Sequence, residues 1–178
     1  MGYVQSFKQK FPDKIEPEMM EAFHGSKNKI EEFSIDNASG SEDEFPGIFF
    51  SSKENTARKK GPYVTKVQLD MNRTVSTQSP PRRTDIVFMV THAPNKDESL
   101  KKYGENPREA YFKATDFIYK GKNARECFHR VYTEFYKDNI KEFVNNMMKC
   151  EYDGMKVERS DESHYIVFNP KTITIVKQ

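Results

Sequence analysis

Tryptophan is absent from this sequence of 178 residues, and cysteine occurs only twice, as Cys127 and Cys150. The two cysteines lie far apart in a segment with helical patterning and form no cluster with metal-site spacing, so we expect two reduced thiols and no bound metal. No apolar run approaches the roughly 18 residues that span a bilayer, and the first residues lack the long apolar stretch of a secretory signal. These absences favour a cytoplasmic protein with no metal cofactor and no membrane partner.

A strong charge of either sign is also missing, because 29 basic residues face 27 acidic ones and leave a formal net charge of +2. A charge this small does not by itself indicate binding to nucleic acid or to a membrane. What the chain does have is aromatic residues, with 14 phenylalanines and nine tyrosines. The length is that of one domain, so we expect residues 1–178 to fold as a single unit around an aromatic core.

The first half of the chain alternates short apolar segments with polar connectors. Strands are predicted over 22–26, 48–50 and 64–71, a short helix capped by Ser52 over 52–59, and a loop over 72–83. Residues 1–20 are expected to be an irregular lead-in. The segment 34–46 is rich in Ser, Asn, Gly and acidic residues, so it is predicted to be a mobile loop that buries little. The apolar run 85–90 fits either a buried strand or a helix, and its periodicity does not decide between them.

The second half changes to helical spacing and then returns to strands. Apolar residues recur every three or four positions from about 107 to 150, which predicts two or three helices broken near Gly121. Strands are predicted over 154–157, 165–168 and 173–176, the first two joined as a hairpin. Strands at both ends with helices between them indicate an α+β fold.

Three segments resemble, in order and spacing, the strand motifs of the ADP-ribosyltransferase fold. They are Phe23-His24-Gly25-Ser26, Gly47-Ile48-Phe49-Phe50-Ser51-Ser52 and His164-Tyr165-Ile166-Val167-Phe168. The resemblance covers residues 20–70 and 150–178 and is closest to small bacterial and phage-type members and to the poly-ADP-ribose-polymerase branch. It implies a split, mainly antiparallel β-sheet in which the helical region near 107–150 is an insertion. It also implies that NAD is the substrate and that no metal takes part.

The cofactor-binding residues implied by the resemblance are His24, Gly25, Ser26, Phe49, Ser51 and Tyr63. A glycine after the histidine lets the backbone approach the nicotinamide carboxamide, where a side chain would obstruct it. His24 is expected on the adenine-side ribose, and Phe49 is expected to stack on the nicotinamide in place of a tyrosine. Two of these residues have a plainer alternative: His24 as an ordinary strand-end histidine, and Tyr63 as a core residue rather than a lid.

The catalytic position is where the sequence departs from the family. Cleaving the glycosidic bond builds positive charge on the ribose, which a nearby carboxylate stabilises. The family usually places a glutamate just before the closing Tyr-Ile-Val strand, and here that position is His164, with Glu162 two residues earlier. Three hypotheses stay open: His164 bonds the ribose hydroxyls as a neutral group, Glu162 or Asp161 supplies the acid, or catalysis has been lost.

The function predicted from the resemblance is mono-ADP-ribosyl transfer from NAD to a macromolecular acceptor, with release of nicotinamide. The acceptor is expected to be a protein, with nucleic acid left open, and the oligomeric state is not predicted. Two alternatives remain, a catalytically lapsed binding module and an NAD glycohydrolase that uses water as the acceptor. The resemblance also implies a toxin-like, phage-related transferase.

Overall fold

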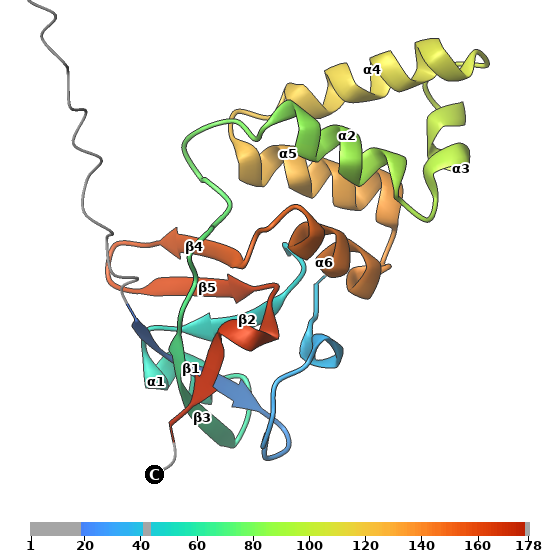
Figure 1. Ribbon diagram of the computed structural model, residues 1–178. Helices are drawn as coiled ribbons and strands as arrows, with labels where there is room; N and C mark the ends of the chain where they lie inside the picture. Colours follow the sequence, from blue (N-terminus) through green and yellow to red (C-terminus); the bar gives the residue numbers. More distant parts are fainter. Residues whose placement is uncertain (1–18, 41–43, 177–178) are drawn as a thin grey trace, which may run out of the picture.

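A single six-stranded sheet in the order β4-β5-β2-β1-β3-β6 forms the base of the molecule (Figure 1). The computed structural model describes residues 19–40 and 44–176. The strands are β1 (Met20–Ser26), β2 (Ile48–Ser51), β3 (Tyr63–Leu69), β4 (Gly154–Glu158), β5 (Ser163–Val167) and β6 (Ile173–Ile175). Every neighbouring pair is antiparallel. The predicted α+β class with a mainly antiparallel sheet is therefore confirmed.

The sheet is divided into two halves that meet at one point. β1 pairs with β3 along its whole length, from Met20 to Ser26. Toward β2, in contrast, β1 has the single register pair Phe23↔Ser51. The strands β4, β5 and β2 therefore form one half and β1, β3 and β6 the other, and β1 and β2 diverge on both sides of this pair.

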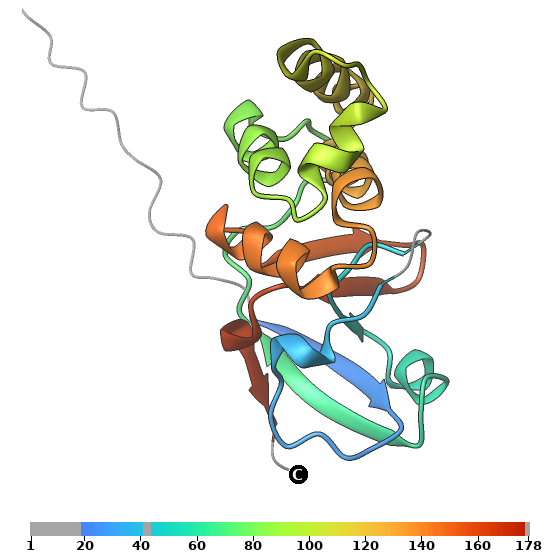
Figure 2. The ribbon, with the colours of Figure 1, turned by 90° about the vertical axis from the view of Figure 1, so that its right-hand side faces the viewer.

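A layer of helices lies on one side of the β4–β5–β2 half, and α1 (Glu54–Arg58) is not part of it. The layer consists of α2 (Arg83–Thr91), α3 (Lys96–Lys101), α4 (Pro107–Tyr119), α5 (Ala124–Val131), the π-helix Tyr132–Tyr136 and α6 (Ile140–Lys149). In Figure 1 and Figure 2, α6 lies beside β4 and β5, α2, α4 and α5 lie beyond it, and α1 lies apart from them near β1 and β3. None of the helices within the described ranges combines the length and apolar character that crossing a bilayer requires.

The predicted break near Gly121 is confirmed, because α4 ends at Tyr119 and α5 begins at Ala124. The helical region starts earlier than 107, however, since the ambiguous run 85–90 is part of α2. Asp85 is 4% exposed in the first turn of that helix. A buried carboxylate needs nearby donors, and Arg82 and Tyr152 supply them to Asp85.

The two faces of the sheet contribute to two separate cores, as strand alternation requires. Phe50 and Tyr165, which pair in register, lie in a smaller core together with Val67. The neighbouring position Ile166 points the other way and packs with α6 in the larger core. Phe50, 3% exposed, is therefore a core residue.

Two local expectations are wrong. The segment 34–46 is not a loop that buries little: Phe45 is 3% exposed and its ring lies 5.8 Å from that of Phe143, while Ser39 pairs with Gly47 as a β-bridge. Residues 41–43 of that segment and 1–18 of the lead-in lie outside the described ranges, and Met20 already begins β1. Ser52 does not cap α1, whose N-cap is Lys53. Its hydroxyl instead accepts the backbone N–H of Ser163 at 2.9 Å, which ties β2 to the start of β5.

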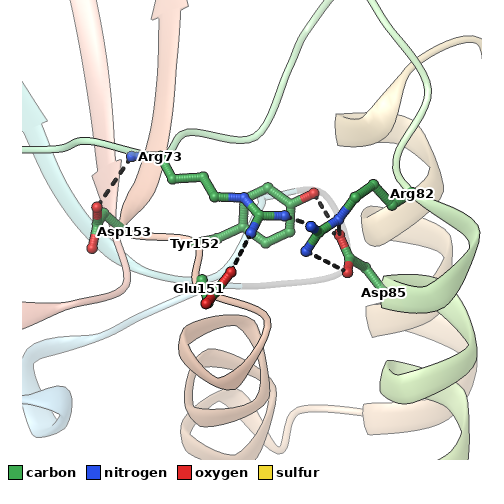
Figure 3. A network of polar contacts seen from close by, with 6 residues as sticks. All are labelled: Arg73, Arg82, Asp85, Glu151, Tyr152 and Asp153. Carbon is green, nitrogen blue, oxygen red and sulfur yellow. Dashed lines mark hydrogen bonds and ion pairs between the residues drawn. The ribbon is translucent and has the colours of Figure 1, made fainter. Parts of the chain in front are cut away.

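A network of charged residues joins the helical layer to the sheet (Figure 3). The carboxylate of Asp85 accepts two hydrogen bonds from Arg82, at 3.0 and 3.1 Å, and one from the hydroxyl of Tyr152 at 2.9 Å. Arg73 reaches Asp85 at 3.4 Å and lies over the Tyr152 ring, 4.5 Å from its centroid. Arg73 also donates its backbone N–H to Asp153, just before β4. The loop before α2 is thereby held against both layers.

We predict that Asp85→Ala lowers the free energy of unfolding by about 1–3 kcal/mol, because Tyr152 and Arg73 lose a shared buried acceptor. Urea denaturation followed by circular dichroism measures the change. Asp97→Ala removes an exposed carboxylate from α3 and is the control, with an expected change within about 0.5 kcal/mol. Equal stability of the two variants would contradict the structural role assigned to Asp85.

Candidate functional site

A pocket of about 490 Å³ opens where β1 and β2 diverge. Its volume lies within the range of about 300–1,000 Å³ that small-molecule sites occupy. The sheet contributes Phe23, His24, Gly25, Phe49, Ser51 and His164 to its lining. The helix α1 contributes Thr56 and Ala57. The split in the sheet is therefore the origin of the cavity.

Strand register explains why four of the lining side chains share one face. Phe23 pairs with Ser51, Ser51 with His164, and His164 with Val157, so the four form a row across β1, β2, β5 and β4. Residues paired across neighbouring strands project from the same side of a sheet. All four line the pocket.

The carboxylate of Glu162 lies behind this row and accepts three hydrogen bonds. Thr56 donates at 2.7 Å, Ser51 at 3.2 Å and the Nε2 atom of His164 at 2.8 Å. These bonds, that of Thr56 above all, lower the pKa of Glu162 to about 2. Its side chain is 15% exposed. Glu162 is therefore an ionised carboxylate held in place from three different segments.

The hydrogen bond to Glu162 determines which ring nitrogen of His164 carries a proton. An ionised carboxylate only accepts, so Nε2 of His164 carries a proton, and Nδ1 is an acceptor when the ring is in its neutral form. His164 lines the pocket, whereas Glu162 touches it only through His164, Ser51 and Thr56. We call these two residues the Glu162–His164 pair. Together they place an acceptor and a negative charge at the pocket wall.

His24 is fixed by a comparable bond on the other side of the split. Its Nδ1 donates to the carbonyl of Phe49 at 2.7 Å, which leaves Nε2 as an acceptor. The ring packs against Phe33 and Phe50, with centroids 5.2 and 5.4 Å away. Burial lowers the pKa of His24 below its ordinary value of 6.5, so the ring is neutral at neutral pH. His24 thus links β1 to β2 where only one backbone pair joins them.

A glycine is required at position 25 because the backbone of α1 approaches β1 closely there. A Cβ atom at this position would lie 1.7 Å from the carbonyl oxygen of Ala57 and 3.3 Å from the Cβ of Lys60. The end of α1 therefore packs directly on the backbone of β1. Because α1 also carries Thr56, the space left by Gly25 helps to position the strongest hydrogen bond to Glu162.

The structure brings together five of the cofactor-binding and catalytic candidates around the pocket, namely His24, Gly25, Phe49, Ser51 and His164, with Glu162 behind them. It does not bring Ser26 or Tyr63 to the pocket. These two pair with each other at the last residue of β1 and the first residue of β3. The Ser26 hydroxyl donates to the carbonyl of Asn28, and Tyr63 is 50% exposed, so it is neither a lid nor a core residue.

Asp161, the other acid considered, lies away from the pair. It forms an exposed ion pair with Lys53 at 2.7 Å. Sequence reasoning missed Thr56, and it missed the cationic residues Arg125 and Arg159 that also line the pocket. Arg125 belongs to α5 and Arg159 to the β4–β5 turn. Within the described part of the chain, no group of three or more His, Cys, Asp or Glu side chains is arranged to hold a metal ion.

Comparison with known proteins gives one family. A family model described as ADP-ribosyltransferase in polyvalent proteins matches residues 16–177. No curated protein matches the chain. A solved structure titled "Crystal structure of an anti-CRISPR protein" aligns with 14% identity, covering 88% of this chain and 93% of that chain. Its TM-score of 0.37 is too low to support an argument about fold or function.

We predict that Gly25→Ala lowers the free energy of unfolding by about 1–3 kcal/mol, because the new methyl group displaces α1 from β1. Chemical denaturation measures the loss. Asn55→Ala, on an exposed part of the same helix, is the matched control. A free energy of unfolding equal to that of the control would contradict this, because it would mean that α1 shifts without loss of stability.

We also predict that Glu162 remains ionised down to pH about 2 and that Thr56→Val raises its pKa toward the ordinary 4.5. The folded pKa lies below the unfolded one, so the stability that Glu162 contributes is complete above pH 4.5 and is lost between 4.5 and 2. A carbon NMR titration of the glutamate carboxyl groups measures both values. A titration of Glu162 near 4.5 in the unaltered protein would contradict the hydrogen-bonded arrangement.

Proposed function

The chain belongs to the ADP-ribosyltransferase family of polyvalent proteins, and from this premise we propose that it transfers one ADP-ribose unit from NAD to a macromolecular acceptor. The members of this family use NAD as their substrate. The observation that carries the proposal is the Glu162–His164 pair on the wall of a pocket of suitable size. The residues in that pocket fit the groups that NAD presents.

The reaction breaks the bond between the nicotinamide nitrogen and C1′ of the ribose. Nicotinamide leaves with the bonding electrons as a neutral molecule, and positive charge develops on the ribose. A nucleophilic atom of the acceptor then attacks C1′ and gives up its proton. A fixed negative charge near C1′ lowers the barrier, because it stabilises the transition state more than the ground state.

Glu162 supplies that charge. Its carboxylate is ionised and hydrogen-bonded before the substrate arrives, so little reorganisation is needed during the reaction. His164 lies between Glu162 and the pocket, and its Nδ1 is free to accept a ribose hydroxyl. In this proposal His164 does not perform the role of the family glutamate by itself. It connects the substrate to a carboxylate two residues earlier.

The remaining lining residues bind and orient the substrate. Phe49 offers an aromatic face on which nicotinamide can stack. The Nε2 atom of His24 accepts from a hydroxyl of the other ribose, since Nδ1 is committed to Phe49. Gly25 exposes backbone at the pocket surface for the carboxamide, in addition to its packing against α1.

We expect the acceptor to be a protein, with nucleic acid as the alternative, because the resemblance points to macromolecular transfer. Incubation with labelled NAD and cell lysate identifies the labelled class. Release of nicotinamide at the same rate with and without lysate would instead indicate a glycohydrolase, in which water is the acceptor.

We predict that Glu162→Gln reduces nicotinamide release by about 10²–10³-fold, because the charge is lost while the size is kept. Chromatographic measurement of nicotinamide, beside a thermal melt to verify folding, tests this. Asp161→Asn removes a neighbouring carboxylate that does not contact His164 and should change the rate less than about twofold.

Two results would contradict the proposal. One is an unchanged rate in a folded Glu162→Gln protein. The other is the absence of both nicotinamide release and an NAD-induced shift in melting temperature in the unaltered protein. A His164→Glu variant separates the remaining hypotheses, because activity that appears only in this variant would identify the natural pocket as one that has lost catalysis.

A further inference from the structure

We propose that Lys60, Arg125 and Arg159 form a binding site for the diphosphate of a dinucleotide on the rim of the pocket. All three line the same cavity as His24 and His164. The inference rests on the proposed function for the identity of the dinucleotide. It goes beyond it by assigning the anion to named residues and by giving the helical layer a part in substrate binding.

The three cations come from three separate segments. Lys60 follows α1, Arg159 follows β4, and Arg125 lies in the first turn of α5. Their convergence is therefore a result of tertiary packing and not of a run of basic residues. The backbone N–H of Arg125 donates to the carbonyl of Ser76 at 3.2 Å, and that of Ala124 donates to Ser79 at 2.7 Å. These two bonds attach the start of α5 to the loop before α2 and place Arg125 against the pocket.

None of the three side chains makes a hydrogen bond or ion pair with another residue in ranges 19–40 and 44–176. Acidic groups are nevertheless near each of them in sequence. Glu158, next to Arg159, pairs with Lys156 at 2.9 Å, and Asp161 pairs with Lys53. Near Lys60, Arg58 pairs with Glu54. Within the described ranges, these neighbouring acids are thus paired with other cations, and the three pocket side chains are left without an ion-pair partner.

The charges of the pocket match those of NAD. Glu162 is negative and lies behind His164, next to where the positively charged nicotinamide ring reacts. The diphosphate carries two negative charges and needs cationic donors elsewhere in the same cavity. Glu44 also lines the pocket and is not without a partner of its own. Concave surfaces concentrate the field of unpaired charges, so three cations on one rim favour an anion there.

Direct binding measurements test the site. Isothermal titration gives the Kd of ADP-ribose, inorganic pyrophosphate and nicotinamide for the unaltered protein and for Lys60→Gln, Arg125→Gln and Arg159→Gln. The controls are Lys59→Gln and Lys122→Gln, which make the same charge change on exposed residues outside the pocket. Thermal melts verify folding in each case.

We expect each pocket variant to raise the Kd of ADP-ribose and of pyrophosphate about three- to tenfold, with nicotinamide and both controls unaffected. The variants should also weaken the dependence of ADP-ribose binding on salt, because fewer exposed charge pairs are screened. The triple variant should combine the three losses.

The outcomes separate this inference from the proposed function. ADP-ribose binding that is the same in all variants overturns the diphosphate site, while nicotinamide release from NAD would leave the transferase proposal standing. Pyrophosphate binding that depends on Arg125, in a protein that releases no nicotinamide, supports the site and contradicts the transferase. Failure of the unaltered protein to bind either anion overturns the site.

Discussion

The single backbone pair between Phe23 and Ser51 is the constraint on which the site depends. Full pairing of β1 with β2 would close the sheet and leave no pocket. No pairing would separate its two halves, since no other strands join them. His24 reinforces the junction through its bond to Phe49, and the missing side chain of Gly25 admits α1 beside it. The cavity is therefore a product of how two sheet halves are joined.

The position of Glu162 follows from the same junction. Its three donors come from β2, α1 and β5, so its carboxylate is held by elements of both the strand pairing and the packing on Gly25. Charge that is fixed in this way does not have to be reorganised when positive charge develops nearby. Asp161, one residue earlier, has only an exposed partner and lacks this support. The two acids are neighbours in the sequence, and the difference between them comes from the groups that surround each carboxylate.

The sequence predicted the elements whose patterns are long and regular, such as β3 and the helices after residue 107. It could not decide the run 85–90, because a short apolar stretch fits both periods and the choice depends on partners of Asp85 far along the chain. Phe45 was missed because one aromatic residue in a polar segment gives no periodic signal. In the candidate site, strand motifs predicted His24, Phe49 and His164, which line the pocket, and Glu162 behind them, while their roles stay predictions. Thr56 and Arg125 could not be found, because their distance from the pocket is set by packing alone.

The helical region is not an insertion that could be removed without altering the pocket. Met155, Ile166 and Phe168, from β4, β5 and the residue after it, share one core with α5 and α6. Ile166 and Val157 also line the pocket, so the same strands face both the helices and the pocket. The Asp85 network and the bonds that hold the start of α5 fix the two layers to each other. Loss of the helices would therefore expose the core beneath the pocket wall as well as remove Arg125. This sharing supports our proposal that residues 1–178 form one domain, in which the helical layer is a structural part of the substrate site.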